Sequence, residues 1–152
     1  DKHKEIIYSG IEYYSNDEVL ILINFNEETA EYDGYSVYRM KDIYAYSDWQ
    51  EEDFAEVKKD NSWYFKNKFK IGTSLNFESA LQKASQYGLI AFFTNLADKD
   101  YYVGKLQSIK ANKAVFNLID EEGDWSGLTP FDIDEICYFG FASSYELELM
   151  KQ

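Results

Sequence analysis

The sequence predicts a mainly β protein with one or two short helices, built as two tandem small five-stranded barrels. Aromatic residues make up 18% of the chain and Pro occurs once, so strand-forming residues are abundant and breakers are few. Short apolar runs alternate with turn residues along the chain. The pattern of residues 5–57 also returns in residues 101–150, which indicates an internal repeat.

The repeat rests on landmarks that occur in the same order in both copies. A strand ends in Gly, a second strand follows an Asn, and an acidic turn and a second Gly precede an acidic-Ile-aromatic strand. The paired landmarks are Gly10 and Gly104, Asn16 and Asn112, Gly34 and Gly127, and Ile43 and Ile136. Superposing the two Asn residues places Val19 on Val115. The copies agree in pattern more than in identity.

In the first copy, strands are expected at residues 6–8 and 18–23, on either side of a turn at Ser15-Asn16-Asp17. Asp33-Gly34 is a favoured turn dipeptide and is expected to form a turn within residues 32–40. A short strand is predicted at 43–46. Ser47-Asp48 is then expected to cap a helical turn that runs to Val57.

The second half begins with the clearest helical pattern, in which Phe77, Leu81 and Ala84 share one face before Gly88. Residues 89–94 are apolar on both faces, as in a central strand. We therefore expect three parts: a first barrel at 1–57, a basic and aromatic connecting segment at 58–73, and a helix with a second barrel at 74–152.

A helix that feeds short, bent strands, with Gly after the first strand and an acidic-Gly turn after the second, resembles the Sm-like type of barrel. The resemblance is carried by the first-copy residues Gly10, Asn16, Asn24, Gly34, Asp42 and Ile43 and by the second-copy residues Gly104, Asn112, Asp120, Gly127, Glu135, Ile136 and Tyr145. From Leu81 onward the chain is similar to small uncharacterised proteins of Gram-positive bacteria that carry a helix, a strand and then such a barrel, and the two copies together resemble tandem Sm-like barrels. This resemblance implies a fold, and it supplies no activity that could be carried over to this chain.

The net charge of −13 and the pI near 4.4 oppose long-range attraction to nucleic acids and anionic membranes. Two interpretations of this acidity stay open. Surface acid keeps a Tyr-rich β protein soluble, or it forms a face for a basic partner.

Catalytic and metal chemistry has little sequence support. His3 is the only histidine and Cys137 the only cysteine, which argues against Ser-His-Asp or Cys-His machinery and the usual zinc sites. The acidic run 120–124 fails as a calcium loop because Trp125 stands where Gly is required and Phe131 where Glu is required. We expect no enzyme activity, cofactor or metal, although Asp120, Glu122 and Asp124 would suit a carboxylate enzyme if they converged in a pocket.

The leading hypothesis is a non-enzymatic module that binds a basic protein partner, in an immunity-like or regulatory role. Exposed Tyr and Trp side chains supply contact area and carboxylates steer a cationic partner. The candidate contact residues, all expected in turns or at the ends of elements, are Tyr13, Tyr14, Trp49, Glu51, Glu52, Asp124 and Trp125.

The alternative is RNA binding through residues 58–70, where lysines alternate with aromatic residues that bases can stack on. Its candidate residues are Lys58, Lys59, Trp63, Tyr64, Lys66, Lys68 and Lys70. The competing interpretation is that the aromatic side chains pack between the barrels while the lysines face water.

A cytoplasmic location is expected, because no intrachain disulfide is possible with a single cysteine and Cys137 is expected to be a buried structural thiol. The longest apolar stretch, 88–93, is too short to span a bilayer, and Asp1-Lys2-His3 does not begin a signal sequence. Exposed barrel edges would allow a homodimer.

Overall fold

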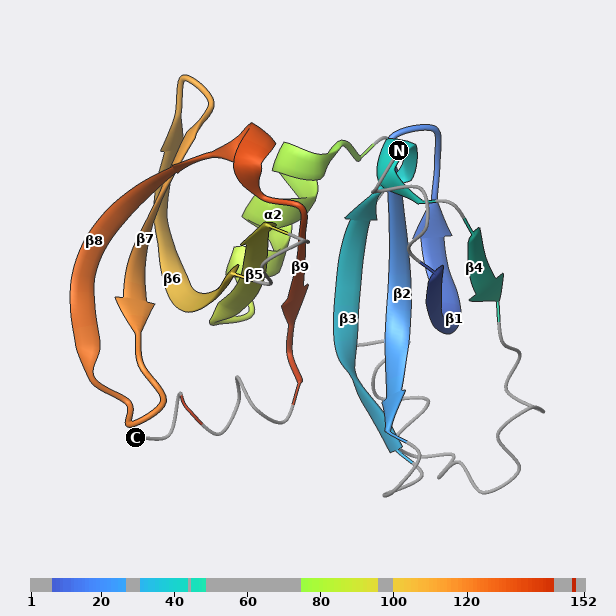
Figure 1. The fold of residues 1–152 in the computed structure, drawn as a ribbon, viewed down its shortest axis with the longest axis horizontal. Helices are drawn as coiled ribbons and strands as arrows, with labels where there is room; N and C mark the ends of the chain where they lie inside the picture. The colour runs from blue at the N-terminus through green and yellow to red at the C-terminus, as the bar shows by residue number, and fades with distance from the viewer. Residues whose placement is uncertain are drawn as a thin grey trace. The chain divides into compact units, whose positions relative to one another are not determined.

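The computed structural model describes residues 7–26, 31–43, 45–48, 75–95, 100–143 and 149. The chain divides into two compact units, unit 1 at residues 1–77 and unit 2 at 78–152 (Figure 1). The connecting segment 58–73 lies outside the described residues. The described fold is mainly β with one α-helix, which confirms the coarse fold class.

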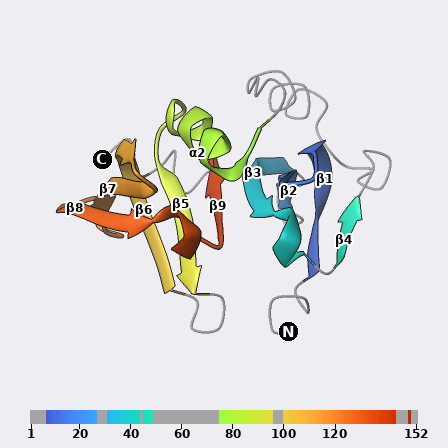
Figure 2. The same ribbon diagram turned by 90° about the horizontal axis from the view of Figure 1, so that it is seen from above.

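The described part of unit 1 is a four-stranded sheet with the strand order β4-β1-β2-β3. Its elements are β1 (Ile7–Ser15), β2 (Val19–Asn26), β3 (Glu31–Arg39), the 3₁₀ turn η2 (Met40–Asp42) and β4 (Ala45–Asp48). The β1, β2 and β3 strands pair in antiparallel fashion, whereas β4 runs parallel to the start of β1 (Figure 2). The apolar run of β2 is fully buried, from Val19 to Ile23.

Unit 2 is a helix followed by an antiparallel sheet with the strand order β9-β5-β6-β7-β8. Its elements are α2 (Phe77–Ser85, assigned to unit 2 from Glu78), β5 (Ile90–Asn95), β6 (Asp100–Lys110), β7 (Lys113–Ile119), β8 (Trp125–Asp132), the 3₁₀ turn η4 (Ile133–Glu135) and β9 (Tyr138–Phe141). The predicted helix is confirmed, since Phe77, Leu81 and Ala84 are buried on it. The both-sided apolar strand is also confirmed as central, because β5 lies between β9 and β6.

An aromatic core fills one face of the unit 2 sheet. Phe92 of β5 lies 4.3 Å from Phe116 of β7 and 5.0 Å from Phe131 of β8, measured between ring centroids. Phe92 and Phe116 are fully buried. Stacked and edge-on arrangements at these spacings are favourable beyond the area they bury. The aromatic residues therefore hold β5, β7 and β8 together across the intervening strand.

The internal repeat is present in the paired strands of both units. The β1–β2 register shifts between Glu12 and Tyr14, and the β6–β7 register shifts at the corresponding place, between Leu106 and Ser108. Gly10 matches Gly104, as predicted. The predicted Asn16–Asn112 match is wrong by two residues, since Val115 corresponds to Ile21 and not to Val19 in these registers. A shift of two leaves every side chain on the same sheet face, so the apolar pattern alone does not reveal it.

The second part of the repeat agrees with the predicted register. Gly34 and Gly127 both have positive φ, at 80° and 108°. The two 3₁₀ turns begin at the matched residues Met40 and Ile133, whose N–H groups donate to the carbonyls of Glu18 and Asn112 at 2.9 and 3.0 Å. The final strands, β4 and β9, follow these turns at the same spacing.

Two closed five-stranded barrels are not formed, so the finer fold prediction is wrong. The described part of unit 1 has four strands and not five, and its last strand, β4, pairs directly with β1. The described residues of unit 2 form five strands in an open sheet, with β9 paired to β5 and β8 paired to β7. The alternation of apolar residues along the sequence predicts the strands and the sheet face on which each side chain lies. It does not predict which edge strands pair, and that pairing decides whether a sheet closes into a barrel.

One local prediction in unit 1 is also wrong. Asp33-Gly34 lies inside β3 and makes no reversal, because Gly34 adopts its positive φ within a continuous strand. Ser47 and Asp48 belong to β4, and the helical turn expected to follow them, through Val57, lies outside the described residues. A turn dipeptide sets the local backbone angles, and neighbouring strand pairing decides whether the chain reverses.

Candidate protein-binding surface

A second apolar cluster covers the face of the unit 2 sheet opposite the aromatic core. It consists of Leu89, Ala91, Val103, Ile119 and Leu149, all of them buried. Ala91 precedes the core residue Phe92 in β5, so the two side chains point to opposite faces. Ala91 pairs with Val103 across β5 and β6. Leu149, near the C-terminal end of the chain, supplies an apolar side chain to this face.

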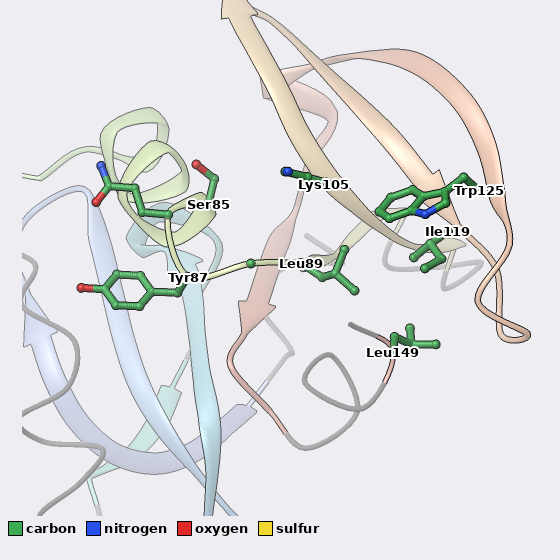
Figure 3. Close-up of a pocket in the computed structure, with 9 residues that line it drawn as sticks. Ser85, Tyr87, Leu89, Lys105, Ile119, Trp125 and Leu149 are labelled. Carbon is green, nitrogen blue, oxygen red and sulfur yellow. The ribbon is translucent and has the colours of Figure 1, made fainter. Parts of the chain in front are cut away.

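A pocket of about 420 Å³ opens beside this cluster (Figure 3). Its lining residues come from the end of α2, from three strands and from the C-terminal segment: Ser85, Gln86, Tyr87, Gly88, Leu89, Lys105, Ile119, Trp125 and Leu149. All of them belong to unit 2. The strands contribute Lys105, Ile119 and Trp125 to one wall in Figure 3, and Leu89 lies between them and α2.

The end of α2 forms the second wall because the chain turns sharply there. The N–H groups of Gln86, Tyr87 and Gly88 donate to carbonyls three residues earlier, at 3.2, 3.0 and 3.3 Å. Such bonds tighten the last helical turn and satisfy its terminal carbonyls. Gly88 has φ of 120°, which permits the change of direction into β5. Leu89 is thereby buried against the sheet.

An acidic loop leads directly into Trp125. One Asp120 side-chain oxygen accepts hydrogen bonds from the N–H groups of Glu122 and Asp124, both at 2.9 Å. The Asp120 N–H donates to the carbonyl of Asp124 at 2.9 Å, and Gly123 has φ of 88°. These bonds fix the loop, while the side chains of Glu121, Glu122 and Asp124 stay exposed.

The carboxylates of Asp120, Glu122 and Asp124 do converge, with one oxygen of each within 4.8 Å of the others. All three residues are exposed, and none lines the pocket beside Trp125. The two backbone hydrogen bonds to Asp120 explain the convergence as a capped turn. The three carboxylates therefore converge at the surface, outside the pocket beside Trp125.

Trp125 and Asp124 are the predicted contact residues that the structure brings to this surface. Trp125 begins β8 with 51% of its area exposed, and Asp124 is exposed beside it in sequence. Leu128, on the same strand, is 66% exposed. Large apolar side chains exposed together on one element mark interaction sites more often than single scattered ones do.

Tyr13 and Tyr14 are placed differently from the prediction, because they lie inside β1 and are half-buried. The Tyr13 ring packs edge-on against Tyr35 with 5.3 Å between centroids. The Tyr14 hydroxyl accepts hydrogen bonds from the Asn16 side chain at 3.1 Å and from the Leu75 N–H at 3.4 Å. Both side chains therefore have structural roles in unit 1.

Several candidates lie outside the described residues. They are Trp49, Glu51 and Glu52 of the protein-binding set and the whole nucleic-acid-binding set, Lys58, Lys59, Trp63, Tyr64, Lys66, Lys68 and Lys70. Cys137 is half-buried and not fully buried as expected. Its N–H donates to the carbonyl of Phe93 at 2.7 Å.

Sequence reasoning missed most of the pocket. Lys105, Ile119 and Leu149 come from distant parts of the chain and meet only through the strand order β6-β7-β8 and the placement of Leu149. Leu128 carried a signal, because it lies in the uncharged run Trp125–Phe131 of a highly charged chain. That signal becomes informative only once β8 is known to be a sheet edge.

A charged group lies at the opposite end of β7 and β8 from Trp125. Lys113 and Asp132 form an ion pair at 2.6 Å. The hydrogen bond from Lys113, followed by one shared with Glu135, lowers the pKa of Asp132. The hydrogen bond with Asp132 raises the pKa of Glu135. The ion pair between Lys113 and Asp132 raises the pKa of Lys113.

Outside this charged group, burial raises the pKa of Tyr138, in β9.

Unit 1 has a smaller pocket of about 260 Å³, lined by Asp17, Glu18, Arg39, Lys41 and Phe77. The Arg39 guanidinium lies 3.8 Å from the centroid of the Phe77 ring, in a cation–π contact. Charges of both signs line this pocket, so its electrostatics favour no one class of ligand.

Comparison with known proteins adds no relative: no family model, curated protein or solved structure matches the chain. Within the described ranges, no helix has the length and apolar character required to cross a membrane. The Sm-like resemblance therefore stays a prediction, and the surface around Trp125 is the feature from which a function can be inferred.

Proposed function

We propose that this chain is a non-enzymatic cytoplasmic interaction module that binds a basic protein partner, in an immunity-like or regulatory role. The observation that carries the proposal is the exposed Trp125, which adjoins both a pocket and a loop with four acidic residues. Trp is among the residues that contribute most to binding energy at protein interfaces. Its exposure leaves a large apolar area for a partner to cover.

The acidic residues beside Trp125 favour a partner with positive charge. Glu121, Glu122 and Asp124 are exposed on a loop whose backbone is fixed by Asp120. Carboxylates on a fixed backbone attract a cationic surface without the cost of ordering the loop on binding. The net charge of −13 adds long-range attraction in the same direction.

The pocket chemistry supports binding over catalysis. Lys105 and Tyr87 are the ionisable residues among those lining it, and Lys105 is exposed. General acid–base or nucleophilic catalysis needs a positioned pair of such groups within hydrogen-bond reach of each other or of the substrate. A mainly apolar pocket lined by the residue that follows an acidic loop fits recognition of a side chain.

The test is affinity capture from lysate of the source organism with the whole chain as bait, at low and high salt. The matched variants are Glu121→Lys with Glu122→Lys, and Asp100→Lys as an exposed charge control on β6. We expect a basic protein that binds the unmodified chain and the control, and that is lost with the double variant. A partner captured equally well by the double variant would contradict the proposal.

The same experiment tests RNA binding, because co-purified RNA can be sequenced. RNA that is retained at low salt, released at high salt and lost when Lys66, Lys68 and Lys70 are changed to Gln would favour the nucleic-acid hypothesis.

A homodimer is tested on the purified chain by sedimentation. Gly127 and Pro130 on β8 work against edge-to-edge pairing, since irregular backbone and Pro protect sheet edges.

A further inference from the structure

We propose that the pocket beside Trp125 anchors one apolar side chain of the partner, and that a Lys or Arg next to this anchor contacts the acidic loop. This inference rests on the proposed function and specifies its ligand as a basic segment with an apolar anchor. The segment would bind to the face of the unit 2 sheet that carries Leu89, Ile119 and Leu149.

The face already accepts an apolar side chain from this chain. Leu149 is only 3% exposed there and forms one cluster with Leu89, Ala91, Val103 and Ile119. The pocket continues from Leu149 to Trp125, with a volume of about 420 Å³. Small-molecule pockets typically have volumes of about 300–1,000 Å³, so the space is sufficient for an anchor residue.

The position of Lys105 leaves one part of the pocket apolar. In Figure 3 its amine end points toward the side of Ser85, at the end of α2, and both residues line the pocket. The C-terminal end of a helix carries partial negative charge, which a lysine complements. The part of the pocket between Ile119 and Trp125 then offers apolar surface, and this surface favours an uncharged anchor.

The rim of the pocket favours a cation beside the anchor. Trp125 is half exposed, and the acidic loop precedes it directly in the chain. A lysine or arginine over the indole would gain a cation–π contact and would approach the carboxylates of Glu122 and Asp124. A second copy of this chain is disfavoured as the occupant, because a two-fold contact at this surface would bring two acidic loops together.

The first experiment selects ligands from a displayed library of random heptapeptides, with the whole chain as the target. We expect enrichment of peptides in which a Leu, Phe or Trp adjoins Lys or Arg. The most enriched sequence is synthesised, together with one version that has Ser at the apolar anchor and one with Glu at each basic position. Both versions should bind at least about tenfold more weakly.

The second experiment locates the peptide on the chain. The indole N–H signal of Trp125 is identified among those of the chain's three Trp residues with Trp125→Phe and should shift on titration. Trp125→Ala and the Glu121→Lys, Glu122→Lys double variant should each reduce affinity at least about tenfold, whereas Asp100→Lys should not. All of these positions are exposed, so amide spectra should show that every variant folds.

The outcomes separate this inference from the proposed function. If the acidic-loop variant weakens binding but Trp125→Ala and the Ser peptide do not, the partner is basic and the pocket inference is wrong. If the selection enriches apolar peptides without basic residues, or acidic ones, the charge assignment fails together with the proposed function. If no sequence is enriched above an unrelated control protein, the anchor inference is overturned, and the capture from lysate decides the proposed function alone.

Discussion

The two copies of the repeat follow the same local pattern but differ in how their first and last strands pair. Both have a register shift in the first strand pair, a positive-φ Gly in the third strand and a 3₁₀ turn before the last strand. In unit 2 the segment Tyr101–Gly104 of β6 pairs with β5. In unit 1 the corresponding segment Ile7–Gly10 of β1 pairs with β4, in parallel.

This difference shows that one repeat pattern permits two positions for its last strand. Where β5 precedes the repeat, it occupies the edge of the first repeat strand, and β9 pairs with the far side of β5. In the described residues of unit 1 that edge is filled by β4. Local sequence sets the strands, turns and bulges, whereas the strands available as neighbours set the sheet order.

The largest expected effect comes from removing a core residue at matched positions, Phe116 in β7 and Leu22 in β2. Both are fully buried and both are the partners at which the register shift occurs. Phe116→Ala should cost about 3–5 kcal/mol and Leu22→Ala about 2–5 kcal/mol of unfolding free energy, from lost transfer energy and the cavity left behind. Amide hydrogen exchange of β2 and β7 measures each cost.

The pattern of exchange tests whether the two units are independent. We expect Phe116→Ala to reduce protection in β7 and to leave β2 unchanged, and the reverse for Leu22→Ala. Leu128→Ala is the control, since a side chain 66% exposed should change stability by less than about 0.5 kcal/mol. Equal loss of protection in β2 and β7 from either core variant would show one cooperative unit.

A smaller effect distinguishes the two kinds of Gly in the repeat. A Cβ on Gly104 would lie 2.7 Å from the carbonyl oxygen of Asn117 and 3.2 Å from the Cα of Leu118. Gly127 has open space around it but φ of 108°. Gly104→Ala should cost about 1–3 kcal/mol through overpacking, and Gly127→Ala about 1–2 kcal/mol through backbone strain.

The substitution of Leu at the same positions separates the two causes. The cost at Gly104 should rise further with Leu, because the space is limited by backbone atoms. The cost at Gly127 should stay close to that of Ala, because the strain comes from φ and nothing lies within 4 Å. Denaturant unfolding measures both series, and a steep rise at Gly127 would contradict the assignment.

The sequence was sufficient for the elements whose signal is local. The helical period identified α2, the two-sided apolar run identified β5 as central, and the repeat placed Gly34 with Gly127 in the correct register. The sequence was insufficient where the structure depends on which strands pair and in which register. The Asn16–Asn112 superposition differs from the observed register by two residues, which conserves the sheet face and so leaves no trace in the apolar pattern.

The candidate site divides in the same way. Trp125 and Asp124 could be predicted because a large aromatic residue after a run of acids is visible in the sequence. Tyr13 and Tyr14 could not be told apart from contact residues, since their half-burial depends on Tyr35 and Leu75. The pocket exists only after the end of α2 and the strands β6, β7 and β8 have been brought together.

The smallest expected effect concerns the ion pair that one unit has and the other lacks. Lys113 pairs with Asp132 between β7 and β8, whereas the matched pair in unit 1 is Val19 and Arg39. Lys113→Met removes the ion pair, so that the β7–β8 pair, like the matched β2–β3 pair, has an apolar residue opposite a charged one at this position. It should raise the pKa of Asp132 towards the ordinary carboxyl value, because the hydrogen bond from Lys113 is the main cause of its lowering.

The sign of the accompanying pH dependence follows from linkage. The lowered pKa of Asp132 stabilises the fold above the ordinary pKa of the carboxyl, and this contribution is lost as pH falls through the folded pKa. The raised pKa of Glu135 acts oppositely, with a contribution that is lost as pH rises through its folded pKa. The stability difference between the unmodified chain and Lys113→Met should therefore be largest near neutral pH and should shrink in acid. Carboxyl-carbon NMR titration of both chains measures the pKa of Asp132, with Lys105→Met as the control. An unchanged pKa in Lys113→Met would mean that Glu135 and the surrounding backbone, and not the lysine, hold the carboxyl of Asp132 in its charged form.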